Sequence, residues 1–291
     1  MISPTDVVAG APAAGGRLLG GAMGPGGGGA GRRRRSGLPS WVSGLIGSAI
    51  LIALWEILAV TVFHKVGSGV PTPTSVVTQF FADAKAGLYG ANFVQTMKEA
   101  ATGFVIGNAI AIVLAVAFVQ LPFVEKALLN IAVASYCLPI VAIGPILTFV
   151  LHGDAPEASL AGLLVFFPTL VGTVVGLRSA DKVTLDVIRA YGGGRWTQLV
   201  KVRLKAALPS TFAALQIAAP SAILGAIVGE YLGGTSTGLG IMLIDAEGAL
   251  DISRTWGIAL VCTGVAGVLY GLIGLLGRLA APWAPRKGIR G

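Results

Sequence analysis

Long apolar runs separated by short polar segments dominate the sequence after residue 40. Six of these runs lie at residues 41–63, 101–119, 127–151, 160–177, 211–229 and 258–276. Each is close to the roughly 20 residues that an α-helix needs to cross a bilayer. Transmembrane β-strands would be about half as long and would alternate between apolar and polar positions. The pattern therefore predicts an all-α integral membrane fold with six transmembrane helices.

The composition supports this fold class and explains the charge. Hydrophobic residues make up 54% of the chain and charged residues only 12%, against about 25% charged in soluble domains. The net charge of +8 could indicate a nucleic-acid partner, but the basic residues follow the segments that connect the apolar runs. We therefore expect a multi-pass protein of the cell membrane and no nucleic-acid partner.

The basic residues are divided unequally between the two sides of the membrane. With the N-terminus placed inside, seventeen lysines and arginines fall on the inner side and four on the outer side. This excess follows the positive-inside rule and predicts that both termini are cytoplasmic. The acidic residues assigned to the outer side are Asp83, Glu99, Asp154, Glu157, Asp245, Glu247 and Asp251.

The ends of the chain differ from its middle. Residues 1–40 are rich in Gly, Ala and Pro and are predicted to form a disordered cytoplasmic tail. The arginine run at 32–35 precedes an apolar stretch that is longer than the roughly 7–15 residues of a signal-peptide core, so we expect an uncleaved first helix. Residues 41–281 form the predicted six-helix domain, and residues 282–291 form a cytoplasmic C-terminal tail.

Small residues recur at helical spacing inside the apolar runs. Four Gly-x-x-x-Gly pairs begin at Gly103, Gly172, Gly225 and Gly267. Such pairs place two glycines on one helix face, where they allow close approach of a second helix. Between the first two runs, residues 74–88 have the periodicity of a short helix in the outer interface or packed on the other helices.

The segment 179–209, between the fourth and fifth runs, is the most unusual part of the sequence. Its first half places Val183, Val187, Ile188 and Tyr191 on one helix face, and its second half does the same with Trp196, Leu199, Val200 and Leu204. Three glycines at 192–194 stand between the halves, where a helix end readily adopts a left-handed backbone. The pattern predicts two short helices that present side chains to a partner, or else an amphipathic loop that rests on the membrane.

Catalytic motifs are absent from the sequence. It contains neither a G-x-x-x-x-G-K-[ST] phosphate loop nor an H-E-x-x-H zinc motif, so we expect no catalytic residue, no metal ligand and no bound cofactor. Energy would then come from another chain or from an ion gradient. The scarcity of acidic groups within the apolar runs, where Glu56 and Glu230 are the main examples, argues against a gradient-driven carrier. The candidates for a transport pathway are Asn108, Gln216, Pro220 and Glu230, with helix packing as the alternative.

Several strings resemble one family. Asp-Val-Ile-Arg-Ala-Tyr-Gly at 186–192, followed by Val-Arg-Leu-Lys at 202–205 and Leu-Pro at 208–209, resembles the Glu-Ala-Ala…Gly…Ile-x-Leu-Pro loop of binding-protein-dependent ABC transporter permeases. Gly-Gly-Gly-Arg-Trp at 192–196 is similar to the Gly-Ala-Ser-Arg-Trp of the nitrate, sulfonate and taurine branch. Similar strings recur at 54–57, 70–73, 138–145, 176–178 and 238–240. The departures are Asp-Val-Ile for Glu-Ala-Ala, and Lys205 where the family usually has proline.

The resemblance implies a transport subunit rather than an enzyme, with six helices of the importer-permease type. ATP would be used by two separate cytoplasmic ATP-binding subunits, and the other partners would be a second permease copy or paralogue, an extracytoplasmic solute-binding protein and membrane lipid. The resemblance places ATPase coupling at Asp186, Arg189, Ala190, Tyr191, Gly192, Gly193, Gly194, Arg195 and Trp196. The alternatives are a six-span secondary carrier not driven by ATP and a membrane scaffold without transport.

Overall fold

The computed structural model describes residues 40–63, 70–137, 139–233 and 236–283. Every element in these ranges is a helix, which confirms the all-α prediction. Most of the two predicted tails lies outside the described residues. The elements are α1 (Ser40–Leu58), η1 (Ala59–Phe63), α3 (Pro73–Lys85), α4 (Tyr89–Gln120), α5 (Pro122–Cys137), α6 (Ile140–Val150), α7 (Ala155–Arg178), α8 (Lys182–Ala190), α9 (Arg195–Gln198), η2 (Leu199–Arg203), α10 (Leu204–Leu232), α11 (Leu239–Gly248) and α12 (Ile252–Ala280).

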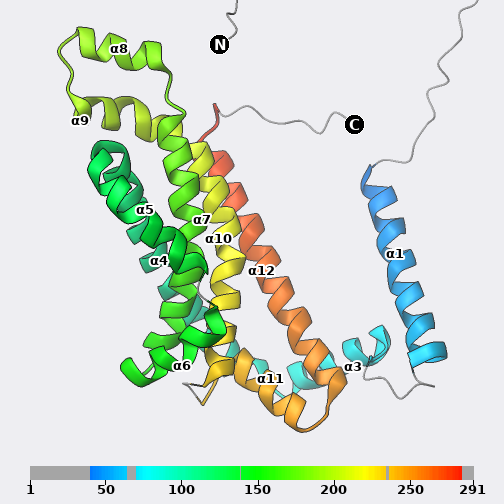
Figure 1. Ribbon diagram of the computed structural model, residues 1–291. Helices are drawn as coiled ribbons and strands as arrows, with labels where there is room; N and C mark the ends of the chain where they lie inside the picture. The colour runs from blue at the N-terminus through cyan, green and yellow to red at the C-terminus, as the bar shows by residue number, and fades with distance from the viewer. Residues whose placement is uncertain (1–39, 64–69, 138, 234–235, 284–291) are drawn as a thin grey trace, which may run out of the picture. The chain divides into compact units, whose positions relative to one another are not determined.

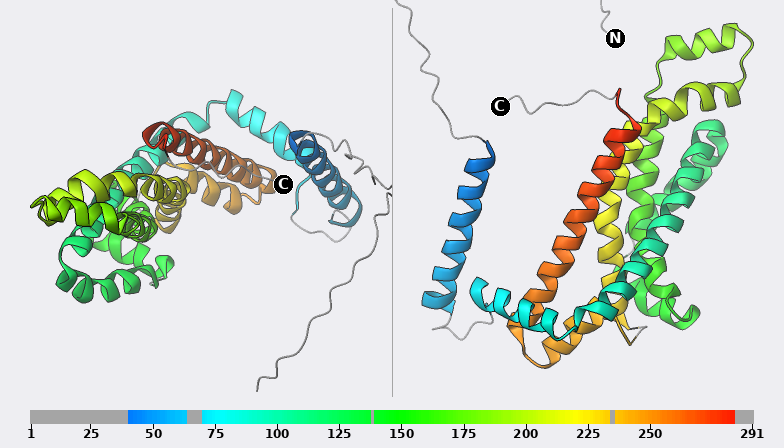
Figure 2. Two further views of the ribbon diagram at one scale, coloured as in Figure 1. Left: turned by 90° about the horizontal axis from the view of Figure 1, so that it is seen from above. Right: turned by 180° about the vertical axis from the view of Figure 1, so that it is seen from behind.

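Four long helices form a bundle in the second of two compact units, which begins at Ala49. Helix α7 packs against both α4 and α10, and α10 also packs against α12 (Figure 1). Helices α8 and α9 lie at the end of the bundle where α12 finishes, whereas α11 lies at the opposite end (Figures 1 and 2). Below, these are called the elbow end and the far end.

The bundle is held together by close contact between small residues. A Cβ atom added to Gly225 of α10 would lie 2.8 Å from the backbone nitrogen of Ala161 in α7, and one added to Gly107 of α4 would lie 2.8 Å from the Cα of Gly162. Lipid tails are as apolar as leucine, so helices in a bilayer associate through such packing rather than through a hydrophobic driving force. Alanine accordingly dominates the buried core between α7 and α10.

The third predicted span is not one helix. The structure places α5 and α6 where one continuous helix was expected over residues 127–151, and Pro139 precedes the first residue of α6. Proline lacks a backbone N–H and disfavours a helical conformation in the residue before it. Five helices in the described residues are long and apolar enough to span a membrane, so the prediction of six spans is not confirmed.

Two long helices begin earlier than the apolar pattern indicates. Helix α4 starts at Tyr89 and α7 at Ala155, twelve and five residues before the predicted positions, so both extend beyond the apolar runs that were expected to define them. The consequence is that Glu99 and Glu157, which were assigned to outer connecting segments, lie inside helices and are fully buried. The short helix predicted over 74–88 is confirmed as α3, whose first turn is capped by Thr72.

Candidate functional site

The elbow (residues 179–209) consists of α8, a glycine turn, α9, η2 and the start of α10. The Asp181 carboxylate begins α8 by accepting hydrogen bonds from the Thr184 hydroxyl at 2.8 Å and the Thr184 amide at 3.0 Å. These bonds lower the pKa of Asp181, because they stabilise its charged form. An aspartate at this position satisfies amides that the first helical turn leaves free, which explains why a helix starts here.

The glycine turn ends α8 as the sequence predicts. Gly192 has φ +78°, its amide donates to the Arg189 carbonyl, and the Gly193 amide donates to the Ile188 carbonyl at 2.8 Å. Many helices end with a residue in the left-handed conformation just after the last turn. That residue is usually glycine, because any side chain there would be strained. A Cβ on Gly192 would meet nothing within 4 Å, so the strain comes from the backbone alone.

One face of the elbow is tied to the bundle. The buried amide of Gln198 donates to the Leu185 carbonyl at 3.3 Å, which joins α9 to α8. Arg203 donates to the Leu177 carbonyl at 3.2 Å, and Gln120 at the end of α4 donates to the Arg195 carbonyl at 3.4 Å. The Gln198 side chain is buried although it is polar, because it satisfies a carbonyl between the two helices.

The other face of the elbow is apolar and open. Its exposed large side chains are Val183, Val187, Tyr191 and Trp196, of which Tyr191 is 89% exposed. Of the nine residues that the resemblance assigns to coupling with an ATP-binding subunit, all are exposed except the half-buried Gly193. Apolar and aromatic side chains held outward on a fixed support are typical of a protein interface, where aromatic residues carry much of the binding energy.

The far end of the bundle holds a buried carboxylate cluster, defined here as Glu99 of α4, Glu157 of α7 and Glu230 of α10. Each of the three side chains is at most 1% exposed. The Glu230 carboxylate accepts a hydrogen bond from the Thr96 hydroxyl at 2.5 Å and another from the Gly240 amide at 2.6 Å. Since Gly240 is in the first turn of α11, these bonds fasten α11 to α10 and α4.

Part of the cluster has no partner among the described residues. Both oxygens of Glu157 lack a hydrogen bond, and no lysine or arginine in the described ranges forms an ion pair with the cluster. Burying an unpaired charge is costly, so such groups are rare inside membrane segments and usually serve a function. The hydropathy pattern does not predict a site at Glu99 and Glu157, because both lie just outside the apolar runs.

The four pathway candidates do not share one set of neighbours. The Asn108 side chain is buried and accepts a hydrogen bond from Thr169 of α7 at 2.5 Å, whereas Gln216 faces Gly274 of α12. Glu230 faces α4 and α11, and Pro220 is half-buried in the middle of α10. Their assignment to a pathway stays a prediction.

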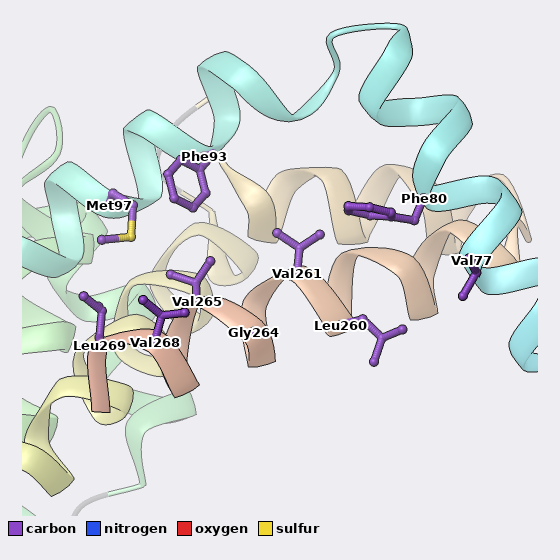
Figure 3. A pocket seen from close by; sticks show the side chains of 10 residues that line it. All are labelled: Val77, Phe80, Phe93, Met97, Leu260, Val261, Gly264, Val265, Val268 and Leu269. Carbon is purple, nitrogen blue, oxygen red and sulfur yellow. The ribbon is translucent and has the colours of Figure 1, made fainter. Parts of the chain in front are cut away.

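An apolar cavity of about 540 Å³ lies between α3, α4 and α12 (Figure 3). Its lining includes Phe80, Phe93, Met97 and Val265, and none of the lining side chains carries a charge or a hydrogen-bonding group. Recognition of a polar solute needs at least a few polar groups placed to orient it. This cavity therefore offers no binding site for a polar solute.

These features define a multi-pass helical membrane protein with a two-helix elbow, exposed on one face, at one end of its bundle. Residues 107–284 match the family of binding-protein-dependent transport system inner membrane components. The chain belongs to this family, which confirms the resemblance found in the sequence. Its place in the cell membrane follows from the family and from the five long apolar helices.

Three relatives illustrate the range of the family. A riboflavin transport system permease protein of Chloroflexus aurantiacus is 29% identical over 235 residues, covering 80% of this chain and 87% of its own. A putative aliphatic sulfonates transport permease protein of Bacillus subtilis is 26% identical over 255 residues, covering 84% and 88%. A formylaminopyrimidine transport permease protein of Halalkalibacterium halodurans is 29% identical over 196 residues, covering 66% and 75%.

Proposed function

We propose that this chain is the permease subunit of an ATP-driven ABC importer for a small organic solute. Its elbow would lie in the cytoplasm, where the open face would enter a cleft of an ATP-binding subunit. Two such subunits, a second permease copy or paralogue and an extracytoplasmic solute-binding protein would complete the transporter. The relatives are named for three chemically different solutes, so the solute of this chain is proposed only as a small organic molecule.

The observation that carries this proposal is the two-sided construction of the elbow. The hydrogen bond from Arg203 to the Leu177 carbonyl fixes one face of the elbow to α7, and the bond from Gln198 to the Leu185 carbonyl joins α9 to α8. Tyr191 and Trp196 project from the other face without burial. A loop resting passively on a membrane would need neither a hydrogen bond to the end of α7 nor a buried hydrogen bond between its own two helices. A force-transmitting element needs both a rigid attachment and an open contact face, and the elbow has both. The excess of basic residues on this side supports its cytoplasmic placement.

The test substitutes the glycine turn and compares it with an equivalent glycine elsewhere. Gly192→Val adds backbone strain of roughly 1–2 kcal/mol and a branched side chain at the open face. Gly87, between α3 and α4, also has positive φ and no neighbour within 4 Å of an added Cβ, so Gly87→Val adds the same strain away from the elbow. We expect Gly192→Val and the charge reversal Arg189→Glu to abolish uptake and to weaken co-purification of the ATP-binding subunit. The membrane abundance of both elbow variants should equal that of the parent chain. Gly87→Val should retain both solute uptake and co-purification of the ATP-binding subunit.

Full uptake in both elbow variants would contradict the coupling role. Uptake that continues after removal of the ATP-binding subunit but stops when the proton gradient is dissipated would favour a secondary carrier instead. Loss of uptake in Gly87→Val to the same extent would show that strain alone, rather than docking, explains the result.

A further inference from the structure

A second cavity, of about 340 Å³, lies on the attached side of the elbow. Its walls come from the end of α4, the start of α5, the end of α7, the start of α8 and η2. The charged side chains in its lining are Glu125, Arg178, Lys182 and Arg203. These four charged residues come from four different helices and line one cavity. The coupling role described above makes no use of this cavity.

The cavity carries an excess of positive charge. Arg178 is paired with Glu125 at 2.6 Å, which neutralises one cation. Arg203 gives one hydrogen bond to the Leu177 carbonyl, and a guanidinium has five N–H donors, so most of its donors are left for another acceptor. Lys182 has no hydrogen bond or ion pair among the described residues and is exposed at the first position of α8. The lining therefore has two positive charges, those of Lys182 and Arg203, that no carboxylate of the lining neutralises.

The rest of the lining is apolar, and part of it lies at the end of a membrane span. Phe118 lies near the last residue of the span Tyr89–Gln120, and Pro122 is the first residue of α5. Next to Pro122 in the chain, Phe123 is 81% exposed. One ligand therefore has to satisfy a cationic wall and an apolar wall at the membrane surface. A phospholipid has this character, with a phosphate above its acyl chains, whereas a free anion would leave the apolar wall without a partner.

We propose that this cavity binds the phosphate of an anionic phospholipid of the cytoplasmic leaflet, held by Lys182, Arg203 and Arg178. The leaflet rests on the orientation given under the proposed function. The bound lipid fixes the position of α8, because Lys182 and Leu185 face the cavity while Val183 and Val187 occupy the opposite helix face. The lipid therefore contacts the attached face of α8 and leaves the open face of the elbow free for docking.

The test measures lipid retention by the purified full-length chain, without an ATP-binding subunit. The chain in neutral detergent is titrated with phosphatidylglycerol or with phosphatidylcholine of the same acyl chains, and bound lipid is counted by native mass spectrometry. We expect preferential retention of phosphatidylglycerol. Lys182→Gln should weaken that retention roughly fivefold, the effect expected from one basic residue near an anionic lipid. Lys201→Gln makes the same charge change at an exposed residue that does not line the cavity, and it should leave retention unchanged.

Two further arms separate the alternatives. Inorganic phosphate should not displace phosphatidylglycerol, and displacement by phosphate alone would assign the cavity to a free anion and overturn the lipid proposal. Equal retention of the two lipids, or equal losses in Lys182→Gln and Lys201→Gln, would also overturn it. Gly192→Val should retain phosphatidylglycerol fully. A negative lipid result would thus leave the importer proposal standing, and a failed coupling test would leave the lipid result standing.

Discussion

The carboxylate cluster and the elbow lie at opposite ends of the same bundle and handle their polar residues in opposite ways. At the far end, three glutamates are buried among helices, and one of them fastens α11 through the Gly240 amide. At the elbow, the pair formed by Asp186 and Arg189 spans 3.3 Å with both side chains about 70% exposed. A buried hydrogen-bonded carboxylate is expected to affect stability, whereas an exposed ion pair contributes little.

This difference in burial indicates that the far end stabilises the bundle, whereas the elbow end is available to a partner. The far end is closed by contacts within the chain, so its polar groups fix helices relative to one another. The elbow end keeps its large side chains, such as Tyr191 and Trp196, without contacts that would bury them. Substitutions that remove a buried hydrogen bond at the far end should therefore lower stability, whereas substitutions on the open face of the elbow should change only the interaction with a partner.

The largest expected effect is on the close packing of α10 against α7. Gly225→Leu would force a side chain into the backbone of Leu160 and Ala161, and overpacking of this kind costs about 3 kcal/mol or more when the backbone cannot move. The measurement is thermal unfolding of the purified chain in detergent. Gly267→Leu is the matched control, since Gly267 also begins a Gly-x-x-x-Gly pair but an added Cβ there meets nothing within 4 Å. Equal destabilisation by the two variants would refute the packing difference.

A smaller loss of stability is expected from Glu230→Ala. The variant removes the acceptor of the buried Gly240 amide, and leaving one such donor unsatisfied costs roughly 1–3 kcal/mol. The Thr96 hydroxyl loses Glu230 but keeps the Asn92 carbonyl as an acceptor at 3.1 Å. The milder Glu230→Gln should keep membrane abundance and lower uptake, because α11 loses part of its attachment to α10. Denaturant unfolding and solute uptake measure the two effects.

Two controls sharpen this second comparison. Glu157→Gln makes the same chemical change in a side chain that has no hydrogen bond to lose, so its stability should match or exceed that of the parent chain. Arg189→Ala on the elbow should stay within about 0.5 kcal/mol, as is usual for surface positions. A destabilised Arg189→Ala, or a Glu157→Gln variant less stable than Glu230→Gln, would remove the contrast between the two ends.

The smallest effect concerns the exposed pair of Lys98 and Asp154 at the far end. The Lys98 ammonium donates to Asp154 at 2.7 Å and lowers the pKa of that carboxyl. A carboxyl whose pKa is lower in the folded chain contributes stability above its unfolded pKa of about 4, and this contribution is lost as the pH falls through the folded pKa. Asp154→Asn should therefore melt slightly below the parent at neutral pH and at the same temperature well below pH 4. If the melting temperatures of Asp154→Asn and the parent chain still differ well below pH 4, the ion pair does not explain the difference.

The helical class, the elbow and its glycine turn could be predicted from the sequence because each depends on local chemistry. Apolar runs of bilayer length leave the backbone no alternative to helix, and Gly192 adopts the left-handed conformation that its residue type permits. The carboxylate cluster could not be predicted in the same way. Glu99 and Glu157 are polar residues at the margins of apolar runs, and hydropathy places such residues in solvent. A signal was nevertheless present, because Glu157, Ala161, Val165, Thr169 and Thr173 recur at every fourth position and are all buried.

The membrane location, the helical fold, the family and the place of the elbow could therefore all be read from the sequence. The tertiary structure is needed to show which small-residue faces are used. The pairs at Gly103, Gly172 and Gly225 meet neighbouring helices, whereas a Cβ added at either glycine of the Gly267 pair would have no described neighbour within 4 Å. The physical reason is that helix formation and membrane insertion depend on each segment alone. Packing depends on which backbone lies opposite a given face, and that information is spread over residues far apart in the chain.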